Sequence, residues 1–170
     1  MKGSSDPHKR LQAEAAEHAI ALAKKLADGK RPGALCTVDK QGVPHMRWMA
    51  TLSLHDFPLL YTITSPKSRK VEHIKHNPNV SWMFSDDTMT VIVNLRGKAR
   101  IVSDAGKMHH VWNLLEDKSK AYFLSIGIDG QGYAVIETEI EDIDCIVPKH
   151  DIKFQATSVG LGSSLRDPGE

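Results

Sequence analysis

Apolar residues recur along this chain with two periods, one typical of helices and one typical of strands. Between Pro7 and Asp28 they return every three or four residues, which predicts a helix with one apolar face that ends at Gly29. From residue 34 onward the period is mostly two, which predicts a series of strands. The helical face consists of Leu11, Ala15, Ala19, Leu22 and Leu26.

Turn residues and prolines divide the rest of the chain. Asp39-Lys40-Gln41-Gly42 is typical of a hairpin turn. A helix is expected to follow residue 64, with Ser65 as N-cap and Pro66 in its first turn, and to stop before Pro78. The last helix is expected over residues 104–124. The expected strands cover residues 34–39, 43–54, 57–64, 80–85, 89–102, 133–140 with an extension after a break over 143–147, and 152–158.

These segments predict a mainly β domain with flanking helices, in the α+β class. Hairpin-linked strands that are six or more in number and long enough to bend favour a closed or nearly closed antiparallel barrel, because closure removes exposed edges. Gly97 interrupts its strand, which predicts a bulge or bend there. The 170 residues fit one domain, with residues 1–6 as a flexible start and residues 160–170 as a loose tail.

Composition narrows the function classes. Basic and acidic residues number 22 and 21, so the net charge of +1 argues against a nucleic-acid protein with a broad basic face. No apolar run approaches the roughly 18 residues of a membrane span, and the start lacks a signal-peptide core, so we expect a cytoplasmic protein. Cys36 and Cys145 are expected to be buried free thiols.

Hydroxyls and cations gather where the middle helix is expected to begin. Ser68, Arg69 and Lys70 lie at its start, directly after a strand that ends in Thr62 and Thr64. Hairpin pairing can bring Arg47 beside them, on the strand face opposite Trp48. A helix start with free N–H groups, hydroxyls and cations suits a phosphate. The alternative is a solvated basic helix start.

Nine histidines raise the question of a metal site. His73 and His76 lie one helical turn apart, and His109 and His110 are adjacent, but neither pair has a third ligand at a suitable spacing. We therefore expect these four side chains on solvated helix faces, no metal site, and His45 on a strand surface.

The ordered set of motifs resembles the pyridoxamine 5′-phosphate oxidase-like family of FMN-binding split barrels. The matching pieces are Arg47-Trp48-Met49-Ala50, Tyr61-Thr62-Ile63-Thr64, Ser68-Arg69-Lys70-Val71, Ile74, Asn77-Pro78-Asn79-Val80 and Gly97-Lys98-Ala99. Within this family the general stress protein 26 branch is the most similar, on Trp112, Tyr122-Phe123, Gly127 and Asp129. The resemblance covers roughly residues 10–147.

This resemblance implies a six-stranded antiparallel Greek-key split barrel, a homodimer, and FMN in the cleft between subunits. Arg47, Arg69 and Lys70 would hold the FMN phosphate with help from Ser68. Backbone groups of residues 48–50 and 61–64 would border the isoalloxazine and the ribityl chain, and a partner Trp could cover the ring. The hydride or electron chemistry would belong to the flavin.

The resemblance implies a flavin-dependent oxidoreductase that acts on an unidentified small molecule, with no side chain identified as acid or base. Two departures argue against true pyridoxamine 5′-phosphate oxidase activity: the end at Leu165-Arg166-Asp167-Pro168 lacks an upstream Arg–Trp partner, and Val91-Ile92-Val93 stands where a glutamine is expected. The alternatives are a stress protein that binds flavin without turnover, and a barrel that binds a deazaflavin or haem.

Overall fold

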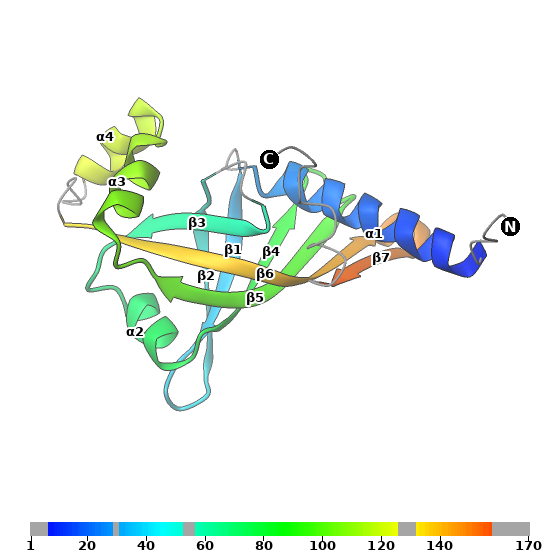
Figure 1. Cartoon of the computed structure of the whole chain (residues 1–170), viewed down its shortest axis with the longest axis horizontal. Helices are drawn as coiled ribbons and strands as arrows, with labels where there is room; N and C mark the ends of the chain where they lie inside the picture. Colours follow the sequence, from blue (N-terminus) through cyan, green and yellow to red (C-terminus); the bar gives the residue numbers. More distant parts are fainter. Residues whose placement is uncertain (1–6, 29–30, 53–56, 126–131, 158–170) are drawn as a thin grey trace, which may run out of the picture.

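The computed structural model describes residues 7–28, 31–52, 57–125 and 132–157 (Figure 1). Helices are α1 (Pro7–Leu26), α2 (Arg69–His76), α3 (Ala105–Asn113), α4 (Asp117–Ser125) and the short 3₁₀ helix η1 (Pro148–His150). Strands are β1 (Pro32–Val38), β2 (Pro44–Ala50), β3 (Leu59–Thr64), β4 (Asn79–Ser85), β5 (Ile92–Ile101), β6 (Ala134–Val147) and β7 (Ile152–Thr157).

All strands belong to one antiparallel sheet in the order β2-β1-β4-β5-β6-β3, with β7 also paired to β6. Its two ends, β2 and β3, approach each other at an isolated bridge between Leu52 and Tyr61, where the Leu52 N–H donates to the Tyr61 carbonyl at 2.8 Å. The predicted split-barrel architecture is confirmed, with seven strands rather than six.

The bulge predicted at Gly97 is present. The β5–β6 register shifts between Arg96 and Gly97, so Glu141 is the extra residue of β6. This bulge replaces the break expected between residues 140 and 143, and β6 runs on as one 14-residue strand. A Cβ atom at Gly97 would lie 1.9 Å from the Glu139 carbonyl oxygen, so only glycine fits there without a backbone shift.

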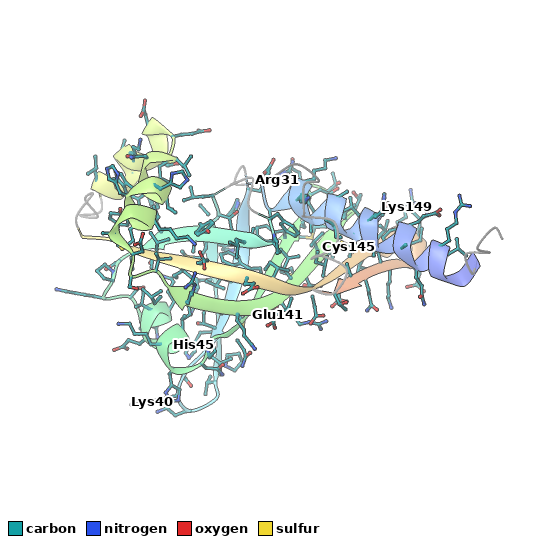
Figure 2. All side chains as sticks on the ribbon, in the orientation of Figure 1. Arg31, Lys40, His45, Glu141, Cys145 and Lys149 are labelled. Atoms are coloured by element: carbon teal, nitrogen blue, oxygen red, sulfur yellow. The ribbon has the colours of Figure 1, made fainter. Side chains whose placement is uncertain are left out.

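Two hydrophobic clusters lie at opposite ends of the sheet. Figure 1 shows α1 along β7 and β6 at one end and the α3–α4 pair at the other. The α1 cluster includes Ala19, Ala23, Leu35, Trp82 and Ile143. The α3–α4 cluster includes Tyr61, Ile63, Val111, Leu115 and Val135. Cys145 is buried beside α1, and its thiol donates to the Ala19 carbonyl at 3.5 Å (Figure 2).

Several predicted boundaries were wrong for local reasons. Leu11 is 64% exposed, because α1 projects beyond the sheet, so only the second half of the expected apolar face is buried. The helix expected over 104–124 is divided into α3 and α4. The break lies at residues 114–116, where the Leu115 side chain is buried in the core. Cys36 and Cys145 are both free thiols as predicted, although Cys36 is only partly buried.

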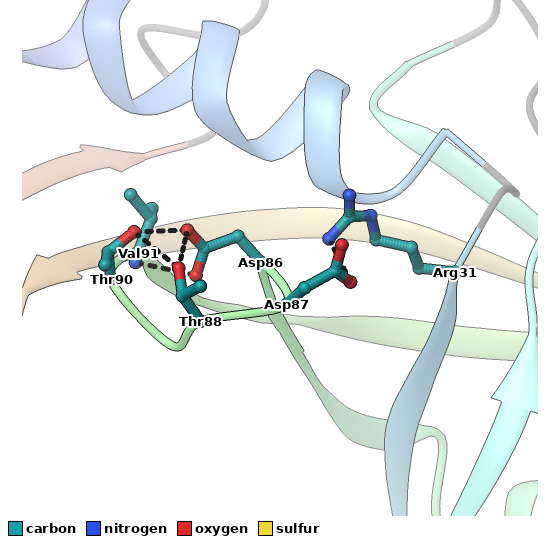
Figure 3. A network of polar contacts seen from close by, with 6 residues as sticks. All are labelled: Arg31, Asp86, Asp87, Thr88, Thr90 and Val91. Carbon is teal, nitrogen blue, oxygen red and sulfur yellow. Dashed lines mark hydrogen bonds and ion pairs between the residues drawn. The ribbon is translucent and has the colours of Figure 1, made fainter.

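The turn between β4 and β5 explains why the long strand begins at Ile92 and not at Met89. The Asp86 carboxylate accepts from the Val91 N–H at 3.1 Å and from the hydroxyls of Thr88 and Thr90 (Figure 3). These hydrogen bonds, that of Thr90 foremost, lower the pKa of Asp86. Asp87 pairs with Arg31 at 2.8 Å, which attaches the turn to the start of β1.

Among the described residues, no helix is long and apolar enough to cross a membrane.

Candidate functional site

Three basic side chains lie around the start of α2. Arg47 comes from β2, and Arg69 and Lys70 are the first two residues of the helix. Burial lowers the pKa of Lys70, and the positive charge of Arg47 lowers it further. Burial also lowers the pKa of Arg47, and the positive charge of Arg69 lowers it further. The three charges therefore repel one another in a partly desolvated place.

Hydroxyl groups surround these cations. The Lys70 ammonium donates to Thr64 Oγ1 at 2.8 Å, and the Thr64 hydroxyl donates to Ser68 Oγ at 3.4 Å. Ser68 is the N-cap residue of α2, with extended backbone and no side-chain cap hydrogen bond. The Val71 N–H donates to the Ser68 carbonyl at 3.0 Å, so the N–H groups of Arg69 and Lys70 at the start of α2 have no side-chain cap from Ser68.

An anion fits this arrangement. Within the parts of the chain that the structure describes, no carboxylate forms an ion pair with Arg47, Arg69 or Lys70. Cations that are partly buried and mutually repelling are stabilised by a bound phosphate, which accepts several hydrogen bonds at once. The donors are the guanidinium of Arg47 on β2, the guanidinium of Arg69 and the ammonium of Lys70 on α2, and the N–H groups at the start of that helix. Such a set suits a phosphate group.

The helix starts three residues later than expected. Ser65 was predicted as N-cap, but residues 65–68 form a turn in which the Ser68 N–H donates to the Ser65 carbonyl at 3.1 Å. Pro66 occupies the second position of that turn, where its fixed φ is as suitable as in a first helical turn. The later start places Arg69 and Lys70 themselves in the first turn.

The backbone of β2 and β3 comes together beside the cations. The Thr62 hydroxyl donates to the Ala50 carbonyl at 2.6 Å, and Met49 packs partly buried on the core. Trp48 is 69% exposed on the opposite face of β2 from Arg47. Tyr61 and Ile63 are buried in the α3–α4 cluster. The Trp48 side chain therefore lies away from the cations, and the Tyr61 side chain is enclosed in the core.

A cavity of about 440 Å³ adjoins the same backbone, between the ends of β2 and β3 and the α3–α4 pair. Its walls are partly apolar and partly polar, and the charged lining residues that the structure describes are carboxylates. The lining residues are Asp28, Ala50, Thr51, Leu52, Ile63, Leu114, Leu115, Glu116, Ser119 and Phe123. This volume is within the range of small-molecule sites.

A second cavity of about 420 Å³ lies between the β1–β2 hairpin and α2. It is lined by Asp39, Lys40, Gln41, His45, Arg69, Glu72, His73 and His76. Figure 2 places His45 beside α2 and Lys40 at the tip of the hairpin. Among the described residues no group of three or more His, Cys, Asp or Glu side chains is arranged to hold a metal ion.

Sequence reasoning missed two residues here. His73 was expected on a solvated helix face, but only 8% of it is exposed, because it packs against β1. Thr37 of β1 is fully buried and contacts both His73 and Arg47. Lys70 and His73 are three residues apart and therefore lie on one helix face. This spacing could have indicated that His73 faces the same side of α2 as Lys70. His76, His109 and His110 are exposed, as predicted.

Comparison with known proteins gives a consistent result. Residues 21–146 match a family model described as pyridoxamine 5′-phosphate oxidase. The chain is 34% identical to general stress protein 26 of Bacillus subtilis (strain 168) over 119 residues, which are 68% of this chain and 79% of that protein.

Solved structures share the fold at lower identity. A protein related to general stress protein 26 from Clostridium acetobutylicum has a TM-score of 0.68 at 20% identity, over 84% of this chain and 96% of that one. A pyridoxamine 5′-phosphate oxidase-related, FMN-binding protein from Nostoc punctiforme has a TM-score of 0.62 at 16% identity, over 91% and 97%. An F420 reductase has a TM-score of 0.53 at 20% identity, over 71% of this chain and 94% of that one. A haem-binding protein from Mycobacterium smegmatis has a TM-score of 0.67 at 16% identity, over 88% of this chain and 60% of that one.

Proposed function

Since this chain belongs to the pyridoxamine 5′-phosphate oxidase family, we propose that it binds FMN, with the phosphate held by Arg47, Arg69 and Lys70. The observation that carries the proposal is the group of three mutually repelling, partly desolvated cations at the start of α2, which pair with no described carboxylate. Ser68, Thr64 and the free N–H groups of α2 would complete the phosphate shell.

The backbone of residues 48–50 and 61–64 would border the rest of the cofactor. Bound FMN supplies hydride or electron transfer. The chain's own residues would bind its phosphate, orient its ring along β2 and β3, and keep water from one side of it. Ala50 and Ile63 line the 440 Å³ cavity, so a small molecule in that cavity would lie beside the ring. On this basis we propose an FMN-dependent oxidoreductase.

The walls of the cavity favour an uncharged or cationic substrate. Among its described lining residues Glu116 is a carboxylate that would repel a phosphate ester. We therefore do not expect pyridoxamine 5′-phosphate oxidase activity in this member of the family.

A second copy of the chain is the proposed partner. One face of β2, β1 and β4 presents exposed apolar side chains, with Met46 64% exposed and Trp48 and Met83 also exposed. A large exposed apolar patch is typical of a protein interface. This face lies on the side of β2 opposite Arg47, so a homodimer formed through it would cover the outer side of β2 and would leave the proposed phosphate site to one subunit.

Other ligands fit less well. Haem is held through an axial ligand to its iron, whereas the cations at the start of α2 suit a phosphate, so they favour FMN over haem. Two alternatives are a deazaflavin cofactor and flavin binding without turnover. The experiment below tests FMN binding first and turnover second.

The test is the visible absorption spectrum of the purified protein before and after addition of FMN, followed by gel filtration. We expect retained flavin bands in the wild type and their loss in Arg69→Ala with Lys70→Ala, by at least about 100-fold in Kd. The matched control, Lys25→Ala with Lys75→Ala, removes two exposed cations of α1 and α2 and should retain FMN.

Wild-type FMN affinity in the Arg69→Ala, Lys70→Ala variant would exclude this phosphate site. Reduction of the retained flavin by NADH or NADPH under steady-state conditions, with reoxidation by an added acceptor, would identify an enzyme. Retained flavin that neither donor reduces would identify a binding protein.

A further inference from the structure

A buried hydroxyl lies directly behind the guanidinium of Arg47. Thr37 of β1 is fully buried, and its Oγ1 is 2.5 Å from Arg47 Nη1 and 2.9 Å from His73 Nδ1. Strand β1, strand β2 and helix α2 each supply one of the three residues, so the contacts connect the three elements that form the proposed phosphate site.

The chemistry of the three groups fixes the direction of each hydrogen bond. A guanidinium has only donors, so Thr37 Oγ1 accepts from Arg47. The hydroxyl also has one proton to donate, and its other described partner is His73 Nδ1. A buried hydroxyl proton is satisfied if His73 Nδ1 accepts it, so we infer a neutral imidazole with its own proton on Nε2.

The surroundings of His73 favour this neutral form. Burial lowers the pKa of His73, and the nearby His45, Arg47 and Arg69 lower it further, while Asp39 acts in the opposite direction. The His45 and His73 rings lie 4.8 Å apart, and His45 is held by Asp39 in the hairpin turn. Lys40, Glu72 and His76 face the same cavity.

We propose that Thr37 and His73 are positioning residues that hold the Arg47 guanidinium toward the flavin phosphate; the inference rests on the proposed function. Arg47 is half-buried on an end strand of the sheet, where its long side chain can adopt several rotamers. If one rotamer is fixed before the ligand binds, less side-chain entropy is lost on binding. Thr37 supplies the fixed acceptor, and His73 directs the hydroxyl proton away from Arg47.

The test compares FMN with riboflavin, which lacks the phosphate, in two variants of the full-length protein. Thr37→Val keeps the shape of the side chain but removes the acceptor, and Thr37→Ser restores it. We expect Thr37→Val to weaken FMN binding about tenfold, measured by quenching of flavin fluorescence, with riboflavin affinity unchanged and Thr37→Ser close to wild type.

Two results would overturn the inference. One is wild-type FMN affinity in Thr37→Val, and the other is an equal loss for FMN and riboflavin, which would indicate a structural role alone. His73→Asn, whose Oδ1 can accept in place of Nδ1, should bind FMN better than His73→Leu, and the reverse order would also contradict it.

A measurement without flavin separates this inference from the proposed function. The ¹⁵N NMR spectrum of His73 in the wild type should show the tautomer protonated on Nε2. An Nδ1–H tautomer would reverse the hydrogen bond between His73 and Thr37 and would overturn the role inferred for His73. If the wild type retains no FMN, the proposed function fails, and the same Thr37 variants are titrated with inorganic phosphate. Unchanged phosphate affinity in Thr37→Val would then overturn the positioning role.

Discussion

Glu137 is a carboxylate buried almost completely on β6, with only 4% of its side chain exposed. Arg100 donates from Nε to Glu137 Oε1 at 2.6 Å, and the Lys107 ammonium of α3 contacts Oε2. Burial raises the pKa of Glu137, but the hydrogen bonds from Lys107 and Arg100 outweigh it, so the pKa lies below its ordinary value. The ion pair between Lys107 and Glu137 holds α3 against the sheet.

Replacement of Glu137 by Gln should therefore destabilise the fold. We expect a loss of about 2 kcal/mol in the free energy of unfolding, less than for a fully buried pair because Lys107 and Arg100 are partly exposed. Urea denaturation measures it, and Glu139→Gln, at an exposed position of the same strand, should change the value by less than about 0.5 kcal/mol.

The same variant should also show a pH dependence. The folded pKa of Glu137 is depressed, so its contribution is fully present above the unfolded pKa near 4.5 and is lost as pH falls through the folded pKa. The difference in stability between wild type and Glu137→Gln should thus shrink below about pH 4.5. A difference that stays constant down to acid pH would contradict the paired, ionised Glu137.

At the scale of elements, the bulge of β5 and β6 depends on one residue without a side chain. Gly97→Ala would place its Cβ against the Glu139 backbone, which cannot move aside as a side chain could. We expect a loss of about 3 kcal/mol, seen as a lower thermal midpoint. Gly106→Ala in α3, where the nearest atom is 3.4 Å away, should instead be neutral or stabilise by up to about 1 kcal/mol.

The middle helix illustrates what the sequence could predict at this scale. Its existence, its end before Pro78 and its buried Val71 and Ile74 follow from local pattern. Its first residue does not, because Ser65-Pro66 suits a turn and a helix start equally well. The burial of His73 was missed for a different reason: it depends on a hydroxyl of β1 that lies 36 residues away in the chain.

The candidate site was predictable to a similar extent. Arg47, Ser68, Arg69 and Lys70 were identified from motif order, and the sheet brings them to one helix end. The orientation of Trp48 could not be inferred in the same way, since alternation gives two faces of a strand but does not say which of them the core covers.

At the scale of the whole molecule, the exposed apolar face leads to a prediction about assembly. Trp48→Glu should convert the proposed dimer into a monomer, because a charge on that face cannot be buried unpaired. Sedimentation velocity measures this effect. Leu11→Glu, which adds the same charge to the exposed end of α1, should leave the dimer unchanged, and a Trp48→Glu dimer would place the interface elsewhere.

The overall architecture was the most predictable feature, because strand periodicity, hairpin turns and the Gly97 bulge are all local signals. The order β2-β1-β4-β5-β6-β3 is not local: it depends on which strands meet across the α3–α4 and α1 clusters. Residue periodicity favoured a closed or nearly closed barrel, and the family resemblance implied a split Greek-key barrel without giving this strand order.

The contact of α1 with β6 and β7 also has a consequence for protein synthesis. The His18 and Phe154 ring centroids lie 4.7 Å apart, and the Cys145 thiol contacts the Ala19 carbonyl 126 residues away in the chain, so α1 rests on strands that are made much later than the helix. At usual translation rates, on the order of ten seconds separate their emergence from the ribosome. During that interval the apolar side of α1 lacks the contacts that β6 and β7 provide, and it is a surface that a nascent-chain chaperone would recognise.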